Sequence, residues 1–350
     1  MRRFLRLRLH WARITMKTRH LLAATCAATL GLVSAAFAGG EGWTHDYEAA
    51  KKQAAAEKKD LLLDFTGSDW CPPCKALNSK VFSQAEFREL TKDKFVLVEL
   101  DFPQDKSKLS EETKKQNNEL QARYAIEGYP TIFLCDASGR PFAKTGFQPG
   151  GPKEYAEHLD ELRGKKGDFD KALAEAGKKE GVDKARALAY CLESLEIGLP
   201  AVSEFYRDVL DQIKAADPES QSGYIQKLEL SRKFAAFDKE LRAFHEAEEP
   251  DWDAAMKMVE KTLADKAFDG DQIFEREKRQ MVLIAKASIL ANQNKFDEAI
   301  KVLDEAKAAA PDSEMAKRVD ALKEQLEEAK NAPQEESGGG EDEKGGKKPE

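Results

Sequence analysis

The sequence predicts a mixed α/β domain, with a central sheet flanked by helices, followed by an all-α domain of helical hairpins. Two observations support this. Between residues 43 and 164, short apolar runs typical of buried strands alternate with helical stretches. From Lys165 to Asn331 almost every window has helical periodicity and prolines are few. We therefore expect an α/β domain at 43–164 and a helical domain at 165–331.

The first 38 residues have the pattern of a secretory signal. They contain seven basic residues and no acidic one, followed by an apolar run from Leu21 to Ala38 that ends in Ala36-Phe37-Ala38. These features are typical of a cleaved signal peptide. We expect residues 1–38 to be removed and the protein to be exported, to a periplasm or outside the cell, or to stay tethered to a membrane if the segment is kept. Met1 and Met16 are both suitable starts.

The net charge and the number of cysteines restrict the classes of function that the protein can have. The 350 residues are 41% hydrophobic and 34% charged, and loss of the seven basic residues would change the formal net charge from −8 to −15. An acidic protein is a poor partner for nucleic acid or anionic membranes. Four cysteines would remain, which are too few for a disulfide framework, so redox chemistry is the better use of the close pair Cys71 and Cys74. Cys135 and Cys191 have the contexts of small buried hydrophobes, and a bond between them stays open.

The elements of the first domain are expected in a simple order. Each apolar run is taken as a strand, and each stretch of helical periodicity as a helix. The expected elements are a helix at 43–59, a strand at 61–65, helices at 75–81 and 83–90, a strand at 95–100, a helix at 111–124, a hairpin of strands at 131–135 and 141–146, and a helix from 152 to about 164.

The chemistry is expected at Cys71 and Cys74, which stand where a strand ends and a helix begins. One helical turn brings both sulfurs to the same face. Cys71 would lie near unpaired N–H groups and the positive end of the helix dipole, which lower a cysteine pKa from about 8.5 to roughly 3.5–7.5. Cys71 is therefore the candidate nucleophile and Cys74 the resolving thiol. A zinc site would need two more close ligands, and His45, His158 and His245 are scattered, so we expect neither metal nor cofactor.

Two motifs resemble the thioredoxin superfamily. They are Trp70-Cys71-Pro72-Pro73-Cys74-Lys75 after a strand and Gly128-Tyr129-Pro130-Thr131 before a hairpin. The stretches Asp64–Cys71, Val98–Pro103 and Gly146–Tyr155 are similar to exported bacterial thioredoxin-like proteins, and the resemblance covers roughly residues 43–164. It implies a redox-active disulfide between Cys71 and Cys74. It also implies a cis-proline at Pro130 beside the sulfurs, and a substrate-binding surface formed by Trp70, Tyr129, Pro130 and Thr131.

Asp64 resembles the buried carboxylate that assists proton transfer to the resolving cysteine in thioredoxins. The sequence departs from that pattern in two ways: one additional residue separates Asp64 from Cys71, and the strand at 95–100 contains no lysine. The candidates for the position opposite Asp64 are Leu97 and Glu99. Either residue would raise the pKa of Asp64, Leu97 by removing a positive charge and Glu99 by adding a negative one.

The second half contains a degenerate repeat. Similar fragments occur at 168–173, 251–256 and 295–300, and residues 287–311 resemble one tetratricopeptide repeat of about 34 residues. We expect stacked antiparallel helix pairs that offer a surface to a protein partner. Residues 332–350 are rich in Gly, Glu and Lys and are expected to be disordered.

Two functions follow. The first is an exported thiol:disulfide oxidoreductase that acts on exported proteins with disulfides or thiols and exchanges electrons with a membrane or periplasmic redox partner. Its direction stays open, because C-x-x-C proteins have potentials from about −270 to −120 mV. The alternative is a non-catalytic peptide- or protein-binding scaffold in which the helical repeats carry the function.

Overall fold

The computed structural model describes residues 41–331. Its strands are β1 (Trp43–Thr44), β2 (Asp60–Thr66), β3 (Phe95–Asp101), β4 (Thr131–Cys135) and β5 (Pro141–Thr145). Its helices are α1 (Tyr47–Glu57), α2 (Pro72–Leu77), α3 (Ala85–Thr91), α4 (Glu111–Arg123), α5 (Pro152–Gly177), α6 (Gly181–Ser194), α7 (Leu199–Phe205), α8 (Arg207–Ala216), α9 (Tyr224–Glu246), α10 (Trp252–Leu263), α11 (Ile273–Asn292), α12 (Phe296–Ala309) and α13 (Glu314–Asn331). Three short turns of helix are η1 (Asn78–Phe82), η2 (Lys106–Lys108) and η3 (Lys266–Phe268). The predicted signal segment at 1–38 and the predicted disordered tail at 332–350 lie outside the described residues.

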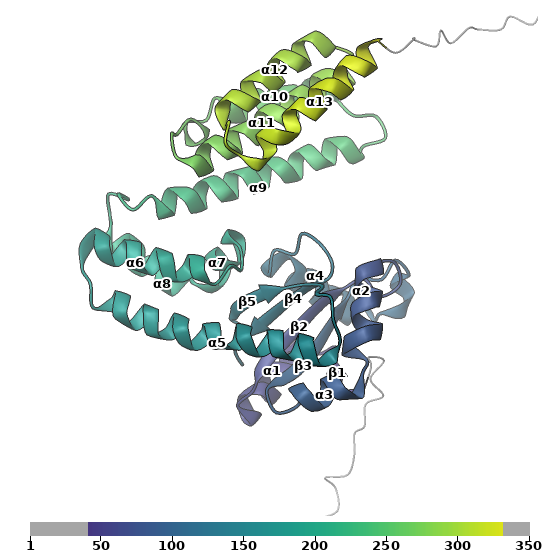
Figure 1. Ribbon diagram of the computed structural model, residues 1–350, viewed down its shortest axis with the longest axis vertical. Coiled ribbons are helices and arrows are strands. Elements are labelled where there is room, and N and C mark those ends of the chain that lie inside the picture. Colours follow the sequence, from purple (N-terminus) through teal and green to yellow (C-terminus); the bar gives the residue numbers. More distant parts are fainter. Residues whose placement is uncertain (1–40, 332–350) are drawn as a thin grey trace, which may run out of the picture.

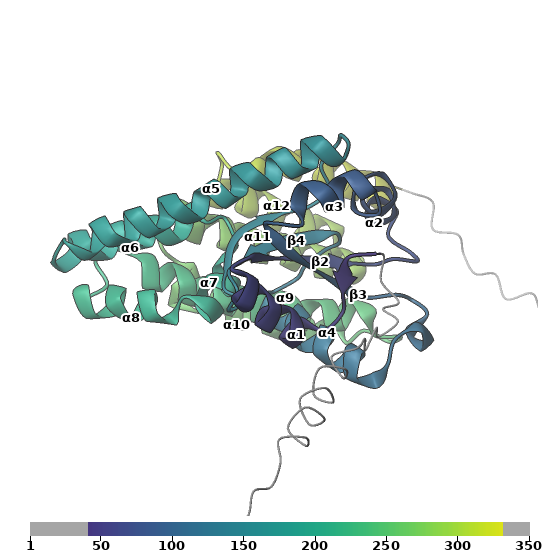
Figure 2. The ribbon, with the colours of Figure 1, turned by 90° about the horizontal axis from the view of Figure 1, so that it is seen from below.

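The five strands form one mixed sheet in the order β1-β3-β2-β4-β5. β1, β3 and β2 run parallel, β4 runs antiparallel to β2, and β5 runs antiparallel to β4. Helices α2, α3 and α5 lie on one face of the sheet and α1 and α4 on the other (Figure 2). All seven residues of the central strand β2 are buried, which explains its apolar sequence on both faces. The predicted fold class, a sheet flanked by helices and followed by a helical region, is confirmed.

The first predicted helix begins later than expected. Trp43 was placed at its start, but Trp43 and Thr44 form the edge strand β1 beside Leu97 and Val98, and α1 begins at Tyr47. The Trp43 side chain packs on Phe82 with ring centroids 4.9 Å apart, and its Nε1 donates to the Phe82 carbonyl. A two-residue strand has no periodicity in the sequence, so only its tertiary contacts define it.

The prediction that the helix at 152 ends near Gly164 was wrong. α5 continues to Gly177, although Gly164 and Gly167 each disfavour a helix interior by about 1 kcal/mol. Arg163 and Lys166 of this helix bind the buried carboxylate of Asp60 at 2.9 and 2.7 Å, and these contacts hold the helix across the sheet. No break in secondary structure marks residue 164, and the division into domains at 43–164 and 165–331 stays a prediction.

Helices α7 and α8 contact the end of the sheet that lies away from the cysteine pair. The Tyr206 hydroxyl donates to the Pro141 carbonyl at 2.7 Å, and Arg140 pairs with Asp208 at 3.0 Å. Phe205 packs on Tyr124 with centroids 4.6 Å apart. These contacts lie at the β4–β5 turn, whereas β2 leads to Cys71 at its opposite end.

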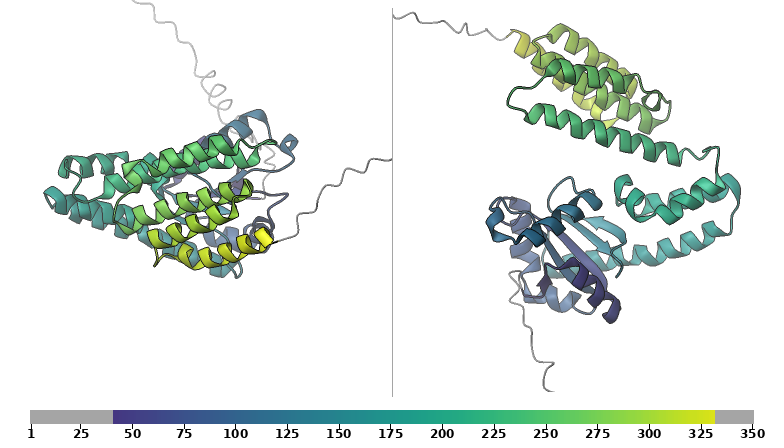
Figure 3. Two further views of the ribbon diagram at one scale, coloured as in Figure 1. Left: turned by 90° about the horizontal axis from the view of Figure 1, so that it is seen from above. Right: turned by 180° about the vertical axis from the view of Figure 1, so that it is seen from behind.

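The remaining helices form a second layer. α5 extends away from the sheet into α6–α8, and the chain then turns back so that α9–α13 lie above the sheet region (Figures 1 and 3). α11 and α12 form the most extensive helix pair, joined by a turn at 293–295. Tyr224 and Leu228 of α9 join the core of the sheet and α5–α8, and the apolar residues from Leu230 onwards build two separate cores. No helix within residues 41–331 is long and apolar enough to cross a bilayer.

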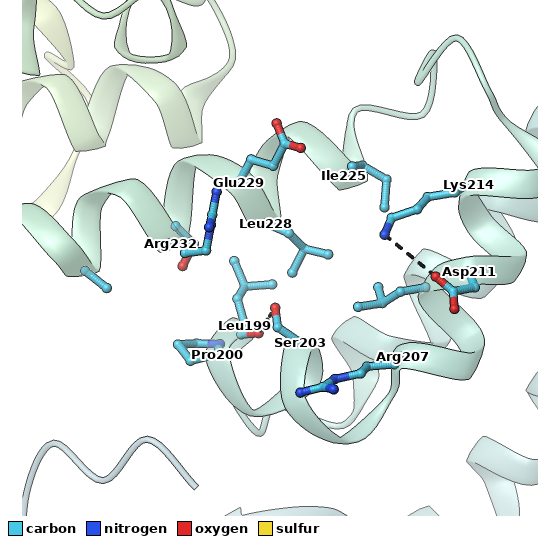
Figure 4. A pocket seen from close by; sticks show the side chains of 13 residues that line it. Leu199, Pro200, Ser203, Arg207, Asp211, Lys214, Ile225, Leu228, Glu229 and Arg232 are labelled. Atoms are coloured by element: carbon cyan, nitrogen blue, oxygen red, sulfur yellow. Dashed lines mark hydrogen bonds and ion pairs between the residues drawn. The ribbon is translucent and has the colours of Figure 1, made fainter. Parts of the chain in front are cut away.

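A cavity of about 560 Å³ lies between α7–α8 and α9 (Figure 4). Its lining includes the apolar side chains of Leu199, Leu210 and Leu228 and the basic side chains of Arg207, Lys214 and Arg232. None of the residues predicted to act in catalysis or substrate binding lines this cavity.

Candidate active site

Cys71 and Cys74 form a disulfide with an S–S distance of 2.07 Å and Cα atoms 5.3 Å apart. Cys71 is the N-cap residue of α2, and Cys74 lies within its first turn. Both residues are almost completely buried, although the neighbouring Trp70 is 39% exposed. The structure therefore brings the two predicted catalytic residues together in the oxidised form.

The start of α2 directs a backbone amide at the Cys71 sulfur. The N–H of Cys74 donates to Sγ of Cys71 at 3.3 Å. Pro72 and Pro73 precede Cys74 in the helix and have no N–H, so the Cys74 amide is the first that the helix offers. A donor at this position stabilises a thiolate on Cys71, which is the expected nucleophile.

The additional residue between Asp64 and Cys71 is accommodated by a loop that binds the end of β3 and the segment after it. Ser68 donates to the Asp101 carboxylate through its N–H at 2.9 Å and its hydroxyl at 2.6 Å. Asp69 accepts from the backbone N–H groups of Gln104 and Asp105 at 2.9 and 3.2 Å and from Lys108 Nζ at 3.0 Å. The bond from Gln104, followed by those from Lys108 and Asp105, lowers the pKa of Asp69 to about 2. The longer link between Asp64 and Cys71 is thus an ordered structure that these hydrogen bonds hold in place.

Trp70 joins the cysteine loop to the proline loop. Its ring meets that of Tyr129 edge to face with centroids 5.7 Å apart, and its Nε1 donates to the Phe102 carbonyl at 2.8 Å. The ring centroids of Phe102 and Tyr129 are in turn 5.3 Å apart. A cavity of about 690 Å³ begins at these three rings and extends along α4.

The other predicted substrate-binding residues differ in position. The Tyr129–Pro130 peptide bond is cis, as the resemblance implied. Tyr129 and Pro130 are half-buried at the surface, but Thr131 is buried and its hydroxyl donates to the Gly128 carbonyl at 2.7 Å. Thr131 therefore braces the loop, and its side chain does not form part of an exposed surface.

Asp64 is buried on the sheet face that also carries α2 and α5. Only 4% of the residue is exposed, and its Oδ1 has no hydrogen-bond partner. In the parallel pairing of β2 with β3 it stands opposite Glu99, which decides between the two candidates for this position. Burial raises the pKa of Asp64 well above its usual value, and the negative charges of Glu99 and Asp101 raise it further. The predicted direction of this shift is confirmed.

Three residues that contribute to the site were not predicted from the sequence. Phe102 completes the aromatic surface, Asp101 holds the cysteine loop, and His45 lies beside Glu99. Alternation along β3 would have placed Glu99 and Asp101 on one face of the sheet. No local pattern marks His45, because its contact with Glu99 joins positions far apart in the chain.

The remaining cysteines do not belong to this site. Cys135 and Cys191 are both free and buried, so the bond between them that the sequence left open is not formed. Burial raises the pKa of each thiol, which makes them poor nucleophiles. Within residues 41–331 no group of three or more His, Cys, Asp or Glu side chains is placed to hold a metal ion.

Comparison with known proteins places the similarity in the sheet region. A family profile described as a thioredoxin-like domain matches residues 47–163. The chain is 37% identical over 113 residues to the disulfide bond reductase DsbH of Chlamydia pneumoniae, a match that covers 32% of this chain and 68% of that protein. It is 29% identical over 104 residues to the thioredoxin-related protein DsbJ of the same organism, which covers 30% of each chain.

A solved structure named DsbH oxidoreductase is 32% identical in sequence and covers 38% of this chain and 91% of that one, with a TM-score of 0.33. Each of these matches covers 38% of the present chain or less.

Proposed function

The chain belongs to the thioredoxin-like family and is a thiol:disulfide oxidoreductase, and we propose that it is exported and that Cys71 and Cys74 are its exchanging pair. The observation that carries this proposal is the Cys71–Cys74 disulfide at the start of α2, with the Cys74 N–H directed at Sγ of Cys71. A sulfur at a helix start with an amide donor is suited to act as the attacking thiolate.

The proposed direction is reduction of substrate disulfides. The name of the relative that is 37% identical, disulfide bond reductase, supports this direction. The Cys71 thiolate attacks one sulfur of the substrate disulfide, and the other substrate sulfur leaves as a thiolate that takes a proton from water. Cys74 then attacks Cys71, the second substrate thiol is released, and the enzyme keeps the Cys71–Cys74 disulfide. A redox partner must supply two electrons and two protons to restore the dithiol.

The proposed substrates are exported proteins that present a disulfide in an extended segment. The exposed ring of Trp70, with Tyr129 and Pro130, provides an apolar surface beside the pair for such a segment. Export is supported by the basic start, the apolar run and the Ala-x-Ala ending of residues 1–38. A periplasmic location and a tetratricopeptide-like role for 165–331, as a surface for a protein partner, belong to the same proposal.

Insulin reduction by the chain from Gly39 to Glu350 tests the activity. The wild type should precipitate insulin in the presence of a dithiol donor, and Cys71→Ser and Cys74→Ser should both be inactive. Cys191→Ala is the matched control, because it removes a buried thiol outside the site. Equal activity of all four proteins would contradict the role of the pair.

Trapping in cells tests the separate roles. Cys74→Ser should accumulate mixed disulfides with exported proteins, because Cys71 attacks but cannot be resolved, whereas Cys71→Ser should not. Trapping of equal amounts by the two variants would contradict the assignment of nucleophile and resolving thiol. Adducts formed only with cytoplasmic proteins would contradict export.

A further inference from the structure

Helix α11 carries apolar side chains on its exposed face. Six large hydrophobic side chains are exposed within residues 41–331, and two of them belong to this helix: Ile273 is 50% exposed and Met281 is 36% exposed. Glu277 lies between them at steps of four residues, and the half-buried Ile284 follows three residues later. Residues three and four apart share one face of a helix. These four side chains therefore form one surface, which we call the α11 row.

The other sides of α11 are already filled by neighbouring helices. Val282 and Ile289 belong to the core that α11 shares with α9 and α10, and Leu283 and Leu290 belong to the core that it shares with α12 and α13. The helix thus packs on both sides and still presents apolar side chains on the outside. Exposed apolar side chains that gather on one surface, unlike scattered ones, mark interaction sites.

Helix α11 passes near the proline loop of the candidate active site. Burial lowers the pKa of Lys278 on this helix, and the negative charge of Glu127, two residues before Tyr129, is the largest effect that opposes it. Lys278 thus lies close enough to Glu127 for their charges to interact. Figures 1 and 3 show the layer of α9–α13 above the sheet region. A polypeptide that leaves the surface of Trp70 and Tyr129 on this side therefore reaches α11.

The carboxylate in the α11 row is free to bind a cation. Nζ of Lys278 lies over the ring of Phe234 on α9, 4.1 Å from its centroid, and Arg279 pairs with Asp269 at 3.4 Å. Glu277 itself has no ion-pair partner among residues 41–331. A carboxylate between two apolar side chains complements a basic side chain between two apolar ones. The formal net charge of −15 expected after loss of residues 1–38 also attracts a basic segment.

The spacing of the α11 row matches an extended chain. A helix rises about 1.5 Å per residue, so Glu277 lies about 6 Å along the helix from Ile273 and about 6 Å from Met281. An extended chain advances about 3.3 Å per residue, so side chains two residues apart lie on one side at intervals of about 6.6 Å. Apolar side chains at positions i and i+4 of such a segment, with a basic one at i+2, thus meet their three counterparts in register.

We propose that the α11 row is a second substrate-binding surface, which binds an extended segment with apolar side chains at i and i+4 and a basic side chain at i+2. The segment belongs to the same polypeptide whose disulfide reacts at Cys71, so this inference rests on the proposed function. The preferred substrates are then unfolded or partly unfolded polypeptides, because folded proteins bury most of their apolar segments. A small disulfide reacts at Cys71 without reaching the row.

The test compares three disulfides in single turnovers of the reduced chain from Gly39 to Glu350. The first is a long peptide with a disulfide loop and a flexible flank that carries Leu at i and i+4 and Lys at i+2. The second peptide has Glu in place of this Lys, and the third disulfide is glutathione disulfide. The flank is placed before the loop and after it in separate peptides. Samples are quenched with acid, and intact mass gives the rate at which the Cys71–Cys74 disulfide forms at each substrate concentration.

The α11 row should affect the peptides only. The wild type should reach its half-maximal rate at a concentration of the Lys peptide about two to five times lower than that of the Glu peptide. Ile273→Ser combined with Met281→Ser should raise this concentration for the Lys peptide about fivefold or more, because two apolar contacts are lost. Glu277→Gln should remove the preference between the peptides. The maximal rates and the reaction with glutathione disulfide should not change, because the row contributes binding and takes no part in the exchange.

Tyr190→Ser is the matched control, since it removes an exposed apolar side chain from α6, and it should behave as the wild type. An unchanged half-maximal concentration in the double variant would overturn the proposal and leave the row to another occupant, such as a second copy of this chain. An equal loss with glutathione disulfide or in Tyr190→Ser would also overturn it, as would a wild type that does not distinguish the two peptides. In these cases the wild type still reacts, so the proposed function stands. A reduced wild type that reacts with none of the three disulfides would overturn the proposed function and this inference together.

Discussion

The indole Nε1 of Trp70 donates a hydrogen bond to the backbone carbonyl of Phe102 at 2.8 Å, which ties the cysteine loop to the segment that follows β3. Gly67 lies directly under the same ring, where a Cβ atom would be 2.6 Å from the indole. Ser68 binds Asp101, the last residue of β3, and Asp69 binds Gln104 of the segment that follows. Ser68, Asp69 and Trp70, which precede Cys71, are therefore all held by this one stretch of chain. Their contacts determine which face of the Trp70 ring is exposed.

Trp70→Phe should weaken both the loop and substrate binding. The variant keeps an aromatic ring but leaves the Phe102 carbonyl without its donor, which should lower the free energy of unfolding by about 0.5–1.5 kcal/mol. Because the ring beside Cys71 is no longer held, KM for insulin should rise more than kcat falls. Urea denaturation and steady-state kinetics measure the two effects, with Trp252→Phe as the control. Unchanged values of both the midpoint and KM would show that this bond does not order the surface.

Asp64 should make stability depend on pH with a definite sign. Its pKa is raised in the folded state, first by burial and then by the charges of Glu99 and Asp101. The folded protein therefore binds this proton more tightly than the unfolded chain does. The stabilisation is fully present below the unfolded pKa of about 3.9 and is lost as the pH rises through the folded pKa.

Asp64→Asn should remove this loss of folding stability at high pH. The variant should be more stable than the wild type at about pH 8, and the difference should shrink as the pH falls towards about 4. Urea denaturation midpoints across this range measure it, with Glu89→Gln as an exposed control. A difference that grows as the pH falls would mean that the Asp64 pKa is lowered in the folded protein, contrary to its burial.

The sequence was sufficient for features that local pattern controls. The buried strands β2 and β3 were predicted from apolar runs, and the cysteine pair was predicted from its spacing and position after a strand. The cis bond before Pro130 followed from the resemblance. In each of these cases, neighbouring residues contain the information.

Features that depend on distant contacts were missed. α5 passes through Gly164 and Gly167 because Asp60, on a distant strand, binds Lys166, and because Phe169 packs on Tyr206 with centroids 5.5 Å apart. The pairing of His45 with Glu99 depends on the register of the edge strand β1, which two residues cannot reveal in advance. Long-range contacts between polar groups were therefore the least predictable part of the candidate site.

The helical region offers a third prediction at Gln280, a fully buried residue of α11. Its Nε2 donates to the carbonyls of Ala306 and Ala310 at 3.0 and 3.2 Å, at the C-terminal end of α12. Its Oε1 accepts from the Ser313 hydroxyl at 2.6 Å, and Ser313 in turn accepts from the N–H of Ala316 at the start of α13. One side chain thus satisfies the end of one helix and orders the start of the next.

Gln280→Leu should leave these carbonyls and the Ser313 hydroxyl unpaired in an apolar core, which costs about 1–3 kcal/mol. Because α11–α13 belong to a core separate from that of the sheet, the loss should be local. Hydrogen exchange followed by mass spectrometry should show faster exchange in 273–331 and unchanged protection in 60–145, while insulin reduction keeps its wild-type rate. Gln293→Leu is the matched control, since the side chain of that half-buried residue bonds to Asp253 and Lys295 and takes no part in the Gln280 network. Faster exchange throughout the sheet as well would show that the two cores unfold together, and would contradict the separation of the helical region from the cysteine site.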